Sequence, residues 1–222
     1  MKALIYLALS TLVFYSLQGQ NAKDYVENAK AGNKVAQYNL GICYDEGWGV
    51  EIDKKQAVYW YEKAAKQEHA NAMYNLAVHY FNGDGVDTSY TLAVYWYEQA
   101  AQKNIVGAML NLGNCYKDSL GVARDYKKAV YWLTKAYEKG SEEAIVSLGY
   151  CYFNGLGVKT NTAKGVSFWK EAAQKGNADA QYNLGLCYEQ GKGINKDLVK
   201  AAYWYSQASQ QGHKEAKKRL TD

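Results

Sequence analysis

An internal repeat with a period of 36 residues dominates this chain. One tyrosine marks the period in every unit, and a leucine four residues earlier keeps the same spacing. The tyrosines are Tyr44, Tyr80, Tyr116, Tyr152 and Tyr188. Counting from them divides the chain into five units: 34–69, 70–105, 106–141, 142–177 and 178–213. A unit of this length buries its apolar face only by stacking on its neighbours, so the sequence predicts a linear array instead of one closed core.

The first half of each unit predicts an amphipathic helix that ends at a glycine-rich turn. In the first unit, Ala36, Leu40 and Tyr44 follow one another at intervals of four residues and share one helix face. The segment 47–50, Gly-Trp-Gly-Val, then ends this helix, because glycine readily adopts the positive φ of a helix C-cap. The third unit has Ser119 in place of the first glycine.

The second half of each unit predicts another helix with its own start signal. A residue type that commonly caps helix N-termini precedes this helix in every unit. These residues are Asp53, Ser89, Asp125, Asn161 and Asp197. In the first unit the following helix carries Ala57, Trp60, Tyr61 and Ala64 on one stripe, where small residues let helices approach and large rings fill the gaps. We therefore predict an all-α, right-handed α-solenoid of helix-turn-helix repeats.

Short segments outside the five units predict solvating caps and an export signal. We interpret residues 20–33 as a capping half-helix and residues 214–222 as a polar C-terminal cap. Lys2 precedes an almost wholly apolar run from Ala3 to Leu17, which is typical of a signal peptide over residues 1–19, although the cleavage site stays open. We expect a secreted or periplasmic protein without a membrane span after cleavage. An uncleaved N-terminal anchor is the alternative.

The repeat motif resembles a known family. Its pattern is Ala-x-Tyr-Asn-Leu-Gly-x-x-Tyr, then Gly-x-Gly-Val, an aspartate, and Lys-Ala-Val-x-Trp-Tyr, and in this form it resembles the Sel1-like repeat family, relatives of tetratricopeptide repeats. The resemblance covers residues 34–213. It implies an adaptor or scaffold in membrane-associated degradation, signalling or bacterial host contact, and it does not identify the partner.

Variable positions on the first helices are the predicted binding residues. Similarity to tetratricopeptide stacking implies that three columns, which begin at Tyr38, Ile42 and Asp45, line a concave groove. Exposed aromatic side chains on such a surface suit a protein or peptide partner. The predicted contact residues, with Trp48 added as an exposed loop aromatic, are Tyr38, Ile42, Trp48, Tyr74, Val78, Phe81, Asn114, Lys117, Tyr150, Phe153, Tyr182, Leu186 and Glu189.

Two interpretations of these columns remain open. The first column, at Tyr38, equally fits a partly structural role in packing against the preceding second helix. Phe81 and Phe153 are stronger candidates for partner contact, because their column otherwise holds Asp45, Lys117 and Glu189, residue types that seldom sit fully buried.

The cysteines predict buried free thiols. Cys43, Cys115, Cys151 and Cys187 occupy one equivalent position per unit, and His79 fills it in the second unit. Equivalent positions on stacked helices lie about 8 to 10 Å apart, beyond the roughly 7 Å that a disulfide tolerates between Cα atoms. The same spacing keeps the side chains from converging on one metal ion. We therefore expect no disulfide, no metal and no cofactor.

Other function classes have weaker support. The net charge of +4 is small for this length and the lysines are interspersed with acids, so charge does not predict nucleic-acid binding. Ser167 and Lys170 form a Ser-x-x-Lys motif, but the Ser-Asp-Asn and Lys-Thr-Gly motifs that accompany it in penicillin-interacting enzymes are absent. We predict a monomeric, non-enzymatic scaffold. The alternatives are a β-lactamase-like or penicillin-binding hydrolase and a structural spacer in a larger membrane or envelope assembly.

Overall fold

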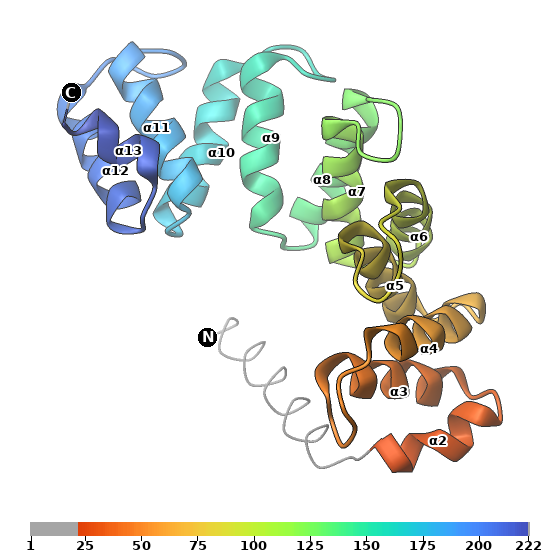
Figure 1. The fold of residues 1–222 in the computed structure, drawn as a ribbon. Coiled ribbons are helices and arrows are strands. Elements are labelled where there is room, and N and C mark those ends of the chain that lie inside the picture. Colours follow the sequence, from red (N-terminus) through yellow and green to blue (C-terminus); the bar gives the residue numbers. More distant parts are fainter. Residues whose placement is uncertain (1–21, 222) are drawn as a thin grey trace. The chain divides into compact units, whose positions relative to one another are not determined.

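The computed structural model describes residues 22–221, which fold into two compact units divided between Ile105 and Val106 (Figure 1). The predicted signal peptide lies outside the described residues. The N-terminal unit contains α2 (Ala22–Lys30), α3 (Lys34–Glu46), α4 (Lys54–Lys66), α5 (Ala70–Asn82) and α6 (Tyr90–Gln102). The C-terminal unit contains α7 (Val106–Asp118), α8 (Tyr126–Glu138), α9 (Glu143–Asn154), α10 (Thr162–Gln174), α11 (Ala178–Gln190), α12 (Leu198–Gln210) and α13 (Lys214–Arg219).

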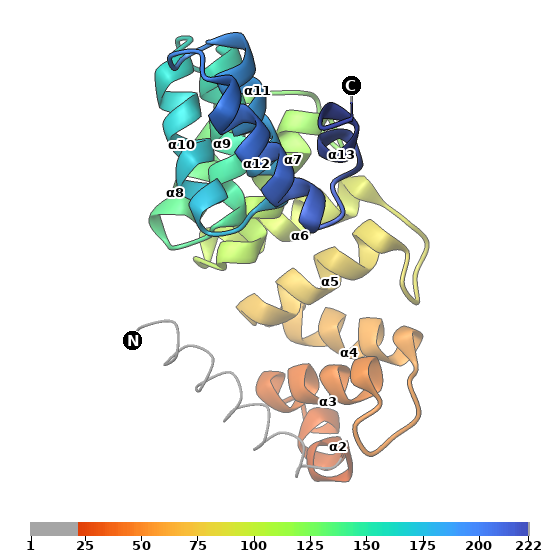
Figure 2. The same ribbon diagram turned by 90° about the vertical axis from the view of Figure 1, so that its left-hand side faces the viewer.

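Within each unit, every helix packs against the next one in the chain, and Figure 2 shows α2 to α5 following one another in this way. Between residues 22 and 221 all regular structure is helical. The predicted all-α architecture of stacked helix pairs, that of an α-solenoid, is thereby confirmed. None of the described helices is long and apolar enough to cross a membrane.

The predicted start of every second helix is confirmed by its cap. Asp53 accepts hydrogen bonds from the backbone amides of Lys55 and Gln56, both at 3.0 Å, and α4 begins at the next residue. Ser89, Asp125, Asn161 and Asp197 cap α6, α8, α10 and α12 in the same manner. Because such a bond satisfies an amide at the helix end that has no intrahelical partner, the boundary follows from one local residue type.

The glycine turns also adopt the predicted conformation. Gly47 ends α3 with φ 76°, and its amide donates to the carbonyl of Cys43. In the third repeat Ser119 takes the same left-handed conformation, with φ 63°, although it carries a side chain. The second glycine of the turn has a further role, since a Cβ at Gly157 would overlap the carbonyl of Tyr126 at the start of α8. The turns that contain Gly85, Gly157 and Gly193 therefore pack closely on the start of the preceding second helix.

Small residues on the first helices face large ones on the second helices. A Cβ at Gly41 would lie 2.6 Å from a ring carbon of Tyr61, and one at Gly149 would lie 2.5 Å from the indole nitrogen of Trp169. The helices of a pair therefore approach at the glycine while the ring fills the space beside it, which confirms the predicted alternation of small and large residues.

Candidate functional site

The predicted contact residues of the N-terminal unit are all half-buried, and all but Trp48 lie on α3 and α5. The Tyr38 ring stacks on His69 with ring centroids 4.4 Å apart and also contacts Tyr61 at 6.0 Å. Tyr74 contacts Tyr97 of α6 at 6.1 Å. The first column therefore has a structural role, but it packs on the second helix of its own repeat, whereas contact with the preceding second helix was expected. Ile42 and Val78, half-buried in the second column, lie one helical turn further along α3 and α5.

The aromatic residues singled out by sequence also make internal contacts. Phe81 packs edge-on against Tyr90 at 5.1 Å. Phe153 lies 4.9 Å from Trp169, and the ammonium of Lys192 sits 4.4 Å from its ring centroid. Both phenylalanines are half-buried. Trp48, expected to stand exposed in its loop, is instead half-buried against the apolar cluster formed by residues of α2, α3 and α4.

The C-terminal unit presents the most exposed of the predicted residues. Tyr150 on α9 leaves 49% of its surface exposed. At the equivalent position of α7, Asn114 accepts a hydrogen bond of 3.0 Å from Ser147 of α9. Leu186 occupies this position on α11 and is half-buried. These residues place an exposed phenol ring between a polar and an aliphatic neighbour along the stacked first helices.

Charged and polar groups surround this column in the C-terminal unit. Lys117 pairs with Asp118 at 3.5 Å. Glu189 accepts a hydrogen bond of 2.8 Å from the hydroxyl of Tyr205 and an ion pair of 3.2 Å from Arg219. Tyr182 stacks on His213 with centroids 4.5 Å apart, as Tyr38 does on His69. Lys117, Glu189 and Tyr182, in the two neighbouring columns, therefore make internal contacts, whereas Tyr150 leaves about half of its surface in solvent.

A buried polar cluster in the N-terminal unit was missed by sequence reasoning. Asp45 of α3 receives the ammonium of Lys54 at 2.6 Å, the hydroxyl of Tyr61 at 3.2 Å and Nε2 of His79 at 3.3 Å. Nδ1 of His79 lies 2.8 Å from the carbonyl oxygen of Asp84. A carbonyl and an ionised carboxylate only accept hydrogen bonds, so this arrangement is satisfied by the doubly protonated imidazolium.

The pKa values in this cluster follow from its contacts. Burial favours the neutral form of Asp45, but the hydrogen bonds from His79 and Lys54 outweigh it and lower the pKa of Asp45 to about 2. Burial likewise opposes the charge on His79, yet its hydrogen bonds to Asp45 and to the Asp84 carbonyl raise its pKa above the ordinary value. Asp45 and His79 lie 34 positions apart in different repeats, so no local motif announces the pair.

The cysteines are free and buried, as predicted. Burial raises the pKa of Cys115, Cys151 and Cys187 to about 11, and it raises that of Cys43 as well. Thiols with such pKa values remain protonated near neutral pH and are poor nucleophiles. Their role in this chain is to fill a small apolar position on the first helix.

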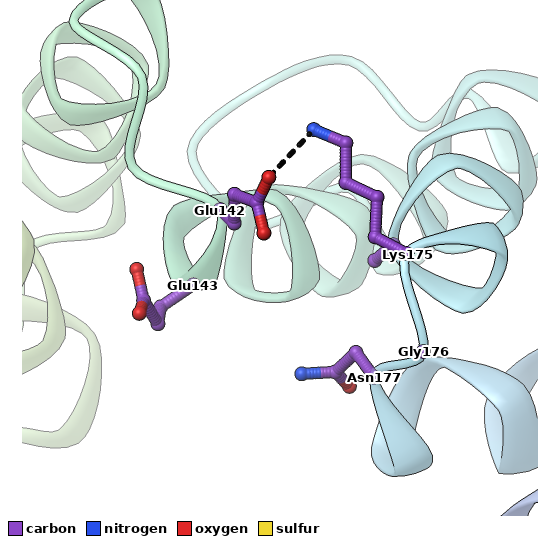
Figure 3. A pocket seen from close by; sticks show the side chains of 6 residues that line it. Glu142, Glu143, Lys175, Gly176 and Asn177 are labelled. Atoms are coloured by element: carbon purple, nitrogen blue, oxygen red, sulfur yellow. Dashed lines mark ion pairs between the residues drawn. The ribbon is translucent and has the colours of Figure 1, made fainter. Parts of the chain in front are cut away.

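The Ser-x-x-Lys motif lies on an exposed face of α10. The hydroxyl of Ser167 donates a hydrogen bond of 2.7 Å to the carbonyl of Lys164 in its own helix. A pocket of about 240 Å³ at the start of α9 is lined by Glu142, Glu143 and Lys175, with Glu142 and Lys175 paired at 3.3 Å (Figure 3). Neither Ser167 nor Lys170 lines that pocket. The motif and the pocket thus do not combine into one site.

Exposed tyrosines at one repeated position of the second helices were also not anticipated. Each stands edge-on to the tryptophan that follows it, with centroids 4.9–5.0 Å apart. The residues are Tyr59, Tyr95, Tyr131 and Tyr203, all about half exposed. The Tyr-Trp pair that recurs at one position of the repeat is the sequence signal that could have found them.

Comparison with known proteins gives a consistent picture. A model of the Sel1 repeat family matches residues 34–69, 70–105, 106–141, 142–177 and 178–213. The structure is similar to that of c5321, a protective antigen present in uropathogenic Escherichia coli strains, with 33% identity, a TM-score of 0.82, and coverage of 90% of this chain and 43% of that one. The chain thus spans less than half the length of that relative.

A second solved structure matches over most of both chains. It is a Sel1 repeat protein from Oxalobacter formigenes, 33% identical with a TM-score of 0.79, covering 90% of this chain and 86% of that one. A Sel1 repeat protein from Klebsiella pneumoniae, at 23% identity and a TM-score of 0.53, shares the fold. Comparison with curated proteins gave no match. Five consecutive matches over residues 34–213, together with these structural relatives, establish that the chain belongs to the Sel1 repeat family, whose members are commonly protein-interaction scaffolds.

Proposed function

We propose that this chain is an exported scaffold that holds a segment of a partner protein against the first helices of its C-terminal unit, α7, α9 and α11. The observation that carries the proposal is the exposure of Tyr150. Its ring stands half in solvent, beside the half-buried Asn114 and Leu186 of the same column. Aromatic residues with a polar tip are enriched among the few side chains that supply most of the binding energy of protein interfaces.

The chemistry of the column indicates the kind of segment that fits. Phe153 and Leu186 offer apolar surface near Tyr150, while Lys117 and Glu189 supply opposite charges at positions further along their helices. A peptide or helix with an apolar anchor and flanking polar residues matches such a surface. The export part of the proposal is supported by the apolar run from Ala3 to Leu17 after Lys2.

The test is site-specific photo-crosslinking in the compartment where the chain resides. A photoreactive amino acid at position 150 should crosslink one saturable partner segment, which mass spectrometry then identifies. Tyr203 of α12 provides a matched control, because it is 54% exposed yet lies on a second helix. Crosslinking of the same segment with equal yield from both positions would contradict the proposed face.

Affinity measurements then separate binding from stability. Tyr150→Ala should weaken binding of the identified segment by about thirtyfold, the effect of removing a side chain worth ~2 kcal/mol. Its unfolding free energy should change by less than about 0.5 kcal/mol, because the ring is largely in solvent. If Tyr150→Ala binds normally, or if it loses binding only because it unfolds, the column acts as part of the structural frame and the chain fits a spacer.

A further inference from the structure

The turns between first and second helices form a second surface with a distinct charge. In the C-terminal unit we define the loop edge as residues 118–128, 154–164 and 190–200, which join α7 to α8, α9 to α10 and α11 to α12. These segments carry eight basic residues and three acidic ones. The basic residues are Arg124, Lys127, Lys128, Lys159, Lys164, Lys192, Lys196 and Lys200. The edge is therefore strongly positive, although the whole chain has a net charge of only +4.

The N-terminal unit shows that this charge is not required by the repeat. Its equivalent segments, 46–56 and 82–92, carry five acidic residues and two basic ones. They form the same turns, with Gly47 and Gly83 in the left-handed conformation and Asp53 and Ser89 as caps. The fold of the turn is thus compatible with either sign of charge.

The three segments of the loop edge are contiguous in space. A Cβ at Gly157 would overlap the carbonyl of Tyr126, and one at Gly193 would lie 2.8 Å from the carbonyl of Thr162. The second and third turns of the edge therefore rest on the N-terminal ends of α8 and α10. Lys192, in the last turn, reaches back to the ring of Phe153 in the preceding repeat. The basic side chains consequently belong to one continuous surface of this unit.

The structure holds several of these cations in place without neutralising them. Lys128, Lys164 and Lys200 occupy the same position in successive repeats. Each ammonium lies over the ring of the tyrosine that marks the repeat period. The distances to the centroids of Tyr116, Tyr152 and Tyr188 are 5.0, 4.0 and 5.5 Å. Among the described residues, Lys200 pairs with Asp197 at 3.0 Å, whereas the other seven basic residues of the edge form no ion pair. A cation–π contact positions an ammonium but leaves its charge available.

Unpaired like charges on one surface repel each other and so oppose compact packing, unless a ligand of opposite charge binds there. Apolar groups share the surface, since Leu198 and Val199 at the start of α12 are 60% and 82% exposed between Lys196 and Lys200. Nucleic acid fits less well, because the side chains exposed between Lys196 and Lys200 are aliphatic and offer no ring on which a base could stack. The combination suits a ligand that carries both carboxylates and aliphatic side chains.

We infer that the loop edge of the C-terminal unit is a second docking surface, adjoining the proposed first-helix site at Phe153, for an acidic protein segment with interspersed aliphatic residues. Carboxylates of the segment pair with the ring-held lysines, and an aliphatic side chain covers Leu198 and Val199. Such a surface accelerates encounter and selects partners by charge, and its affinity falls as salt rises.

The test uses the full chain and a short fluorescent peptide of repeating Glu-Glu-Leu, with binding followed by anisotropy at increasing salt. The triple variant Lys128→Gln, Lys164→Gln, Lys192→Gln should weaken binding about tenfold at low salt, as expected from the loss of three surface ion pairs. The control triple variant Lys139→Gln, Lys170→Gln, Lys217→Gln has the same net charge and replaces exposed lysines outside the edge. It should bind within about twofold of the natural chain, since charges away from the contact contribute little.

Further measurements decide the remaining outcomes. Tyr150→Ala should bind this peptide normally, so that failure of the proposed first-helix site and failure of the loop edge are distinguishable. Equal weakening by both triple variants would overturn the inference, as would the absence of saturable peptide binding. Tighter binding of a single-stranded oligonucleotide or of phosphatidylserine vesicles, lost in the loop-edge variant alone, would assign the surface to nucleic acid or membrane and equally overturn it.

Discussion

Replacing His79 with cysteine should remove a pH dependence that is confined to the N-terminal unit. The other four repeats have cysteine at this position, so His79→Cys fits the frame while deleting the imidazolium that bonds Asp45 at 3.3 Å. The pKa of His79 is raised in the folded state. Its contribution to stability is therefore fully present below the unfolded pKa of 6.5 and is lost as pH rises through the folded pKa.

The magnitude follows from the shift on the partner carboxylate. The pKa of Asp45 falls from 3.8 to about 2, and one pKa unit corresponds to ~1.36 kcal/mol. Lys54 shares this shift and the side chain of Asp45 is 15% exposed, so the part lost when His79 deprotonates is about 1 kcal/mol. The carboxylate itself stabilises the fold above pH 3.8, and that contribution is lost as pH falls toward 2.

Hydrogen exchange measured by mass spectrometry can localise the effect. Amides of α3 and α5 should lose about fivefold protection between roughly pH 5.5 and 8.5, after correction for intrinsic exchange, and His79→Cys should abolish this loss. Helices α9 and α11, with Cys151 and Cys187 in the column, are the internal control. Burial lowers the pKa of His69, so this residue destabilises the fold below pH 6.5. The natural chain and the His79→Cys variant both contain His69, so its effect cancels in the comparison. An unchanged alkaline loss in His79→Cys would refute the reasoning.

Three further predictions concern the frame of the C-terminal unit. Gly157→Ala should lower the unfolding free energy of this unit by about 2 kcal/mol or more in urea titrations, because the φ of +71° and the carbonyl of Tyr126 both oppose a Cβ. Gly140→Ala should lower it by about 1 kcal/mol, because Gly140 has a φ of +94° but open space around it. Asp125→Ala should cost ~1 kcal/mol through loss of the α8 cap, while Asn at this position should restore it. Cys151 should react with a thiol reagent only after unfolding, and rapid labelling of the folded chain would contradict its burial.

Features that depend on one repeat could be predicted from the sequence. A cap such as Asp53 or Asp197 acts on amides two and three residues away, and a turn glycine sets its own φ, so residue type alone fixed these boundaries. The small and large residues of each helix pair, such as Gly41 and Tyr61, were likewise predictable from their repeated spacing. These contacts recur in every unit and are therefore reinforced by the period.

Contacts between repeats, and contacts with helices outside the repeats, could not be predicted from the sequence. Asp45 lies in the first repeat and His79 in the second. No other two successive repeats carry this combination of side chains at the same positions. Trp48 was expected in solvent, but it packs against an apolar cluster to which α2, a helix outside the five repeats, contributes. Unique contacts carry no periodic signal, so a sequence shows the two residues without showing that they meet.

One position in the repeat shows why variability alone overstates a binding surface. At the third variable column, Asp45 and Glu189 accept hydrogen bonds from the hydroxyls of Tyr61 and Tyr205, whereas Phe153 packs against an indole ring at the same place in its repeat. The residue at this column contacts a side chain of the second helix in each of these repeats. The differences between repeats at this column therefore reflect packing within the repeat before any partner contact.

Side chains that differ between repeats and are exposed to solvent are better candidates for partner contact. Tyr150 meets this criterion on the first helices, and Lys128 and Lys164 meet it on the loop edge, where each ring contact leaves the ammonium exposed. In a repeat protein the frame can tolerate either sign of charge at such positions, as the acidic turns of the N-terminal unit demonstrate. Partner contacts in this chain are therefore assigned to side chains that are exposed and that differ between repeats at positions where the packing of the repeat does not require a particular residue.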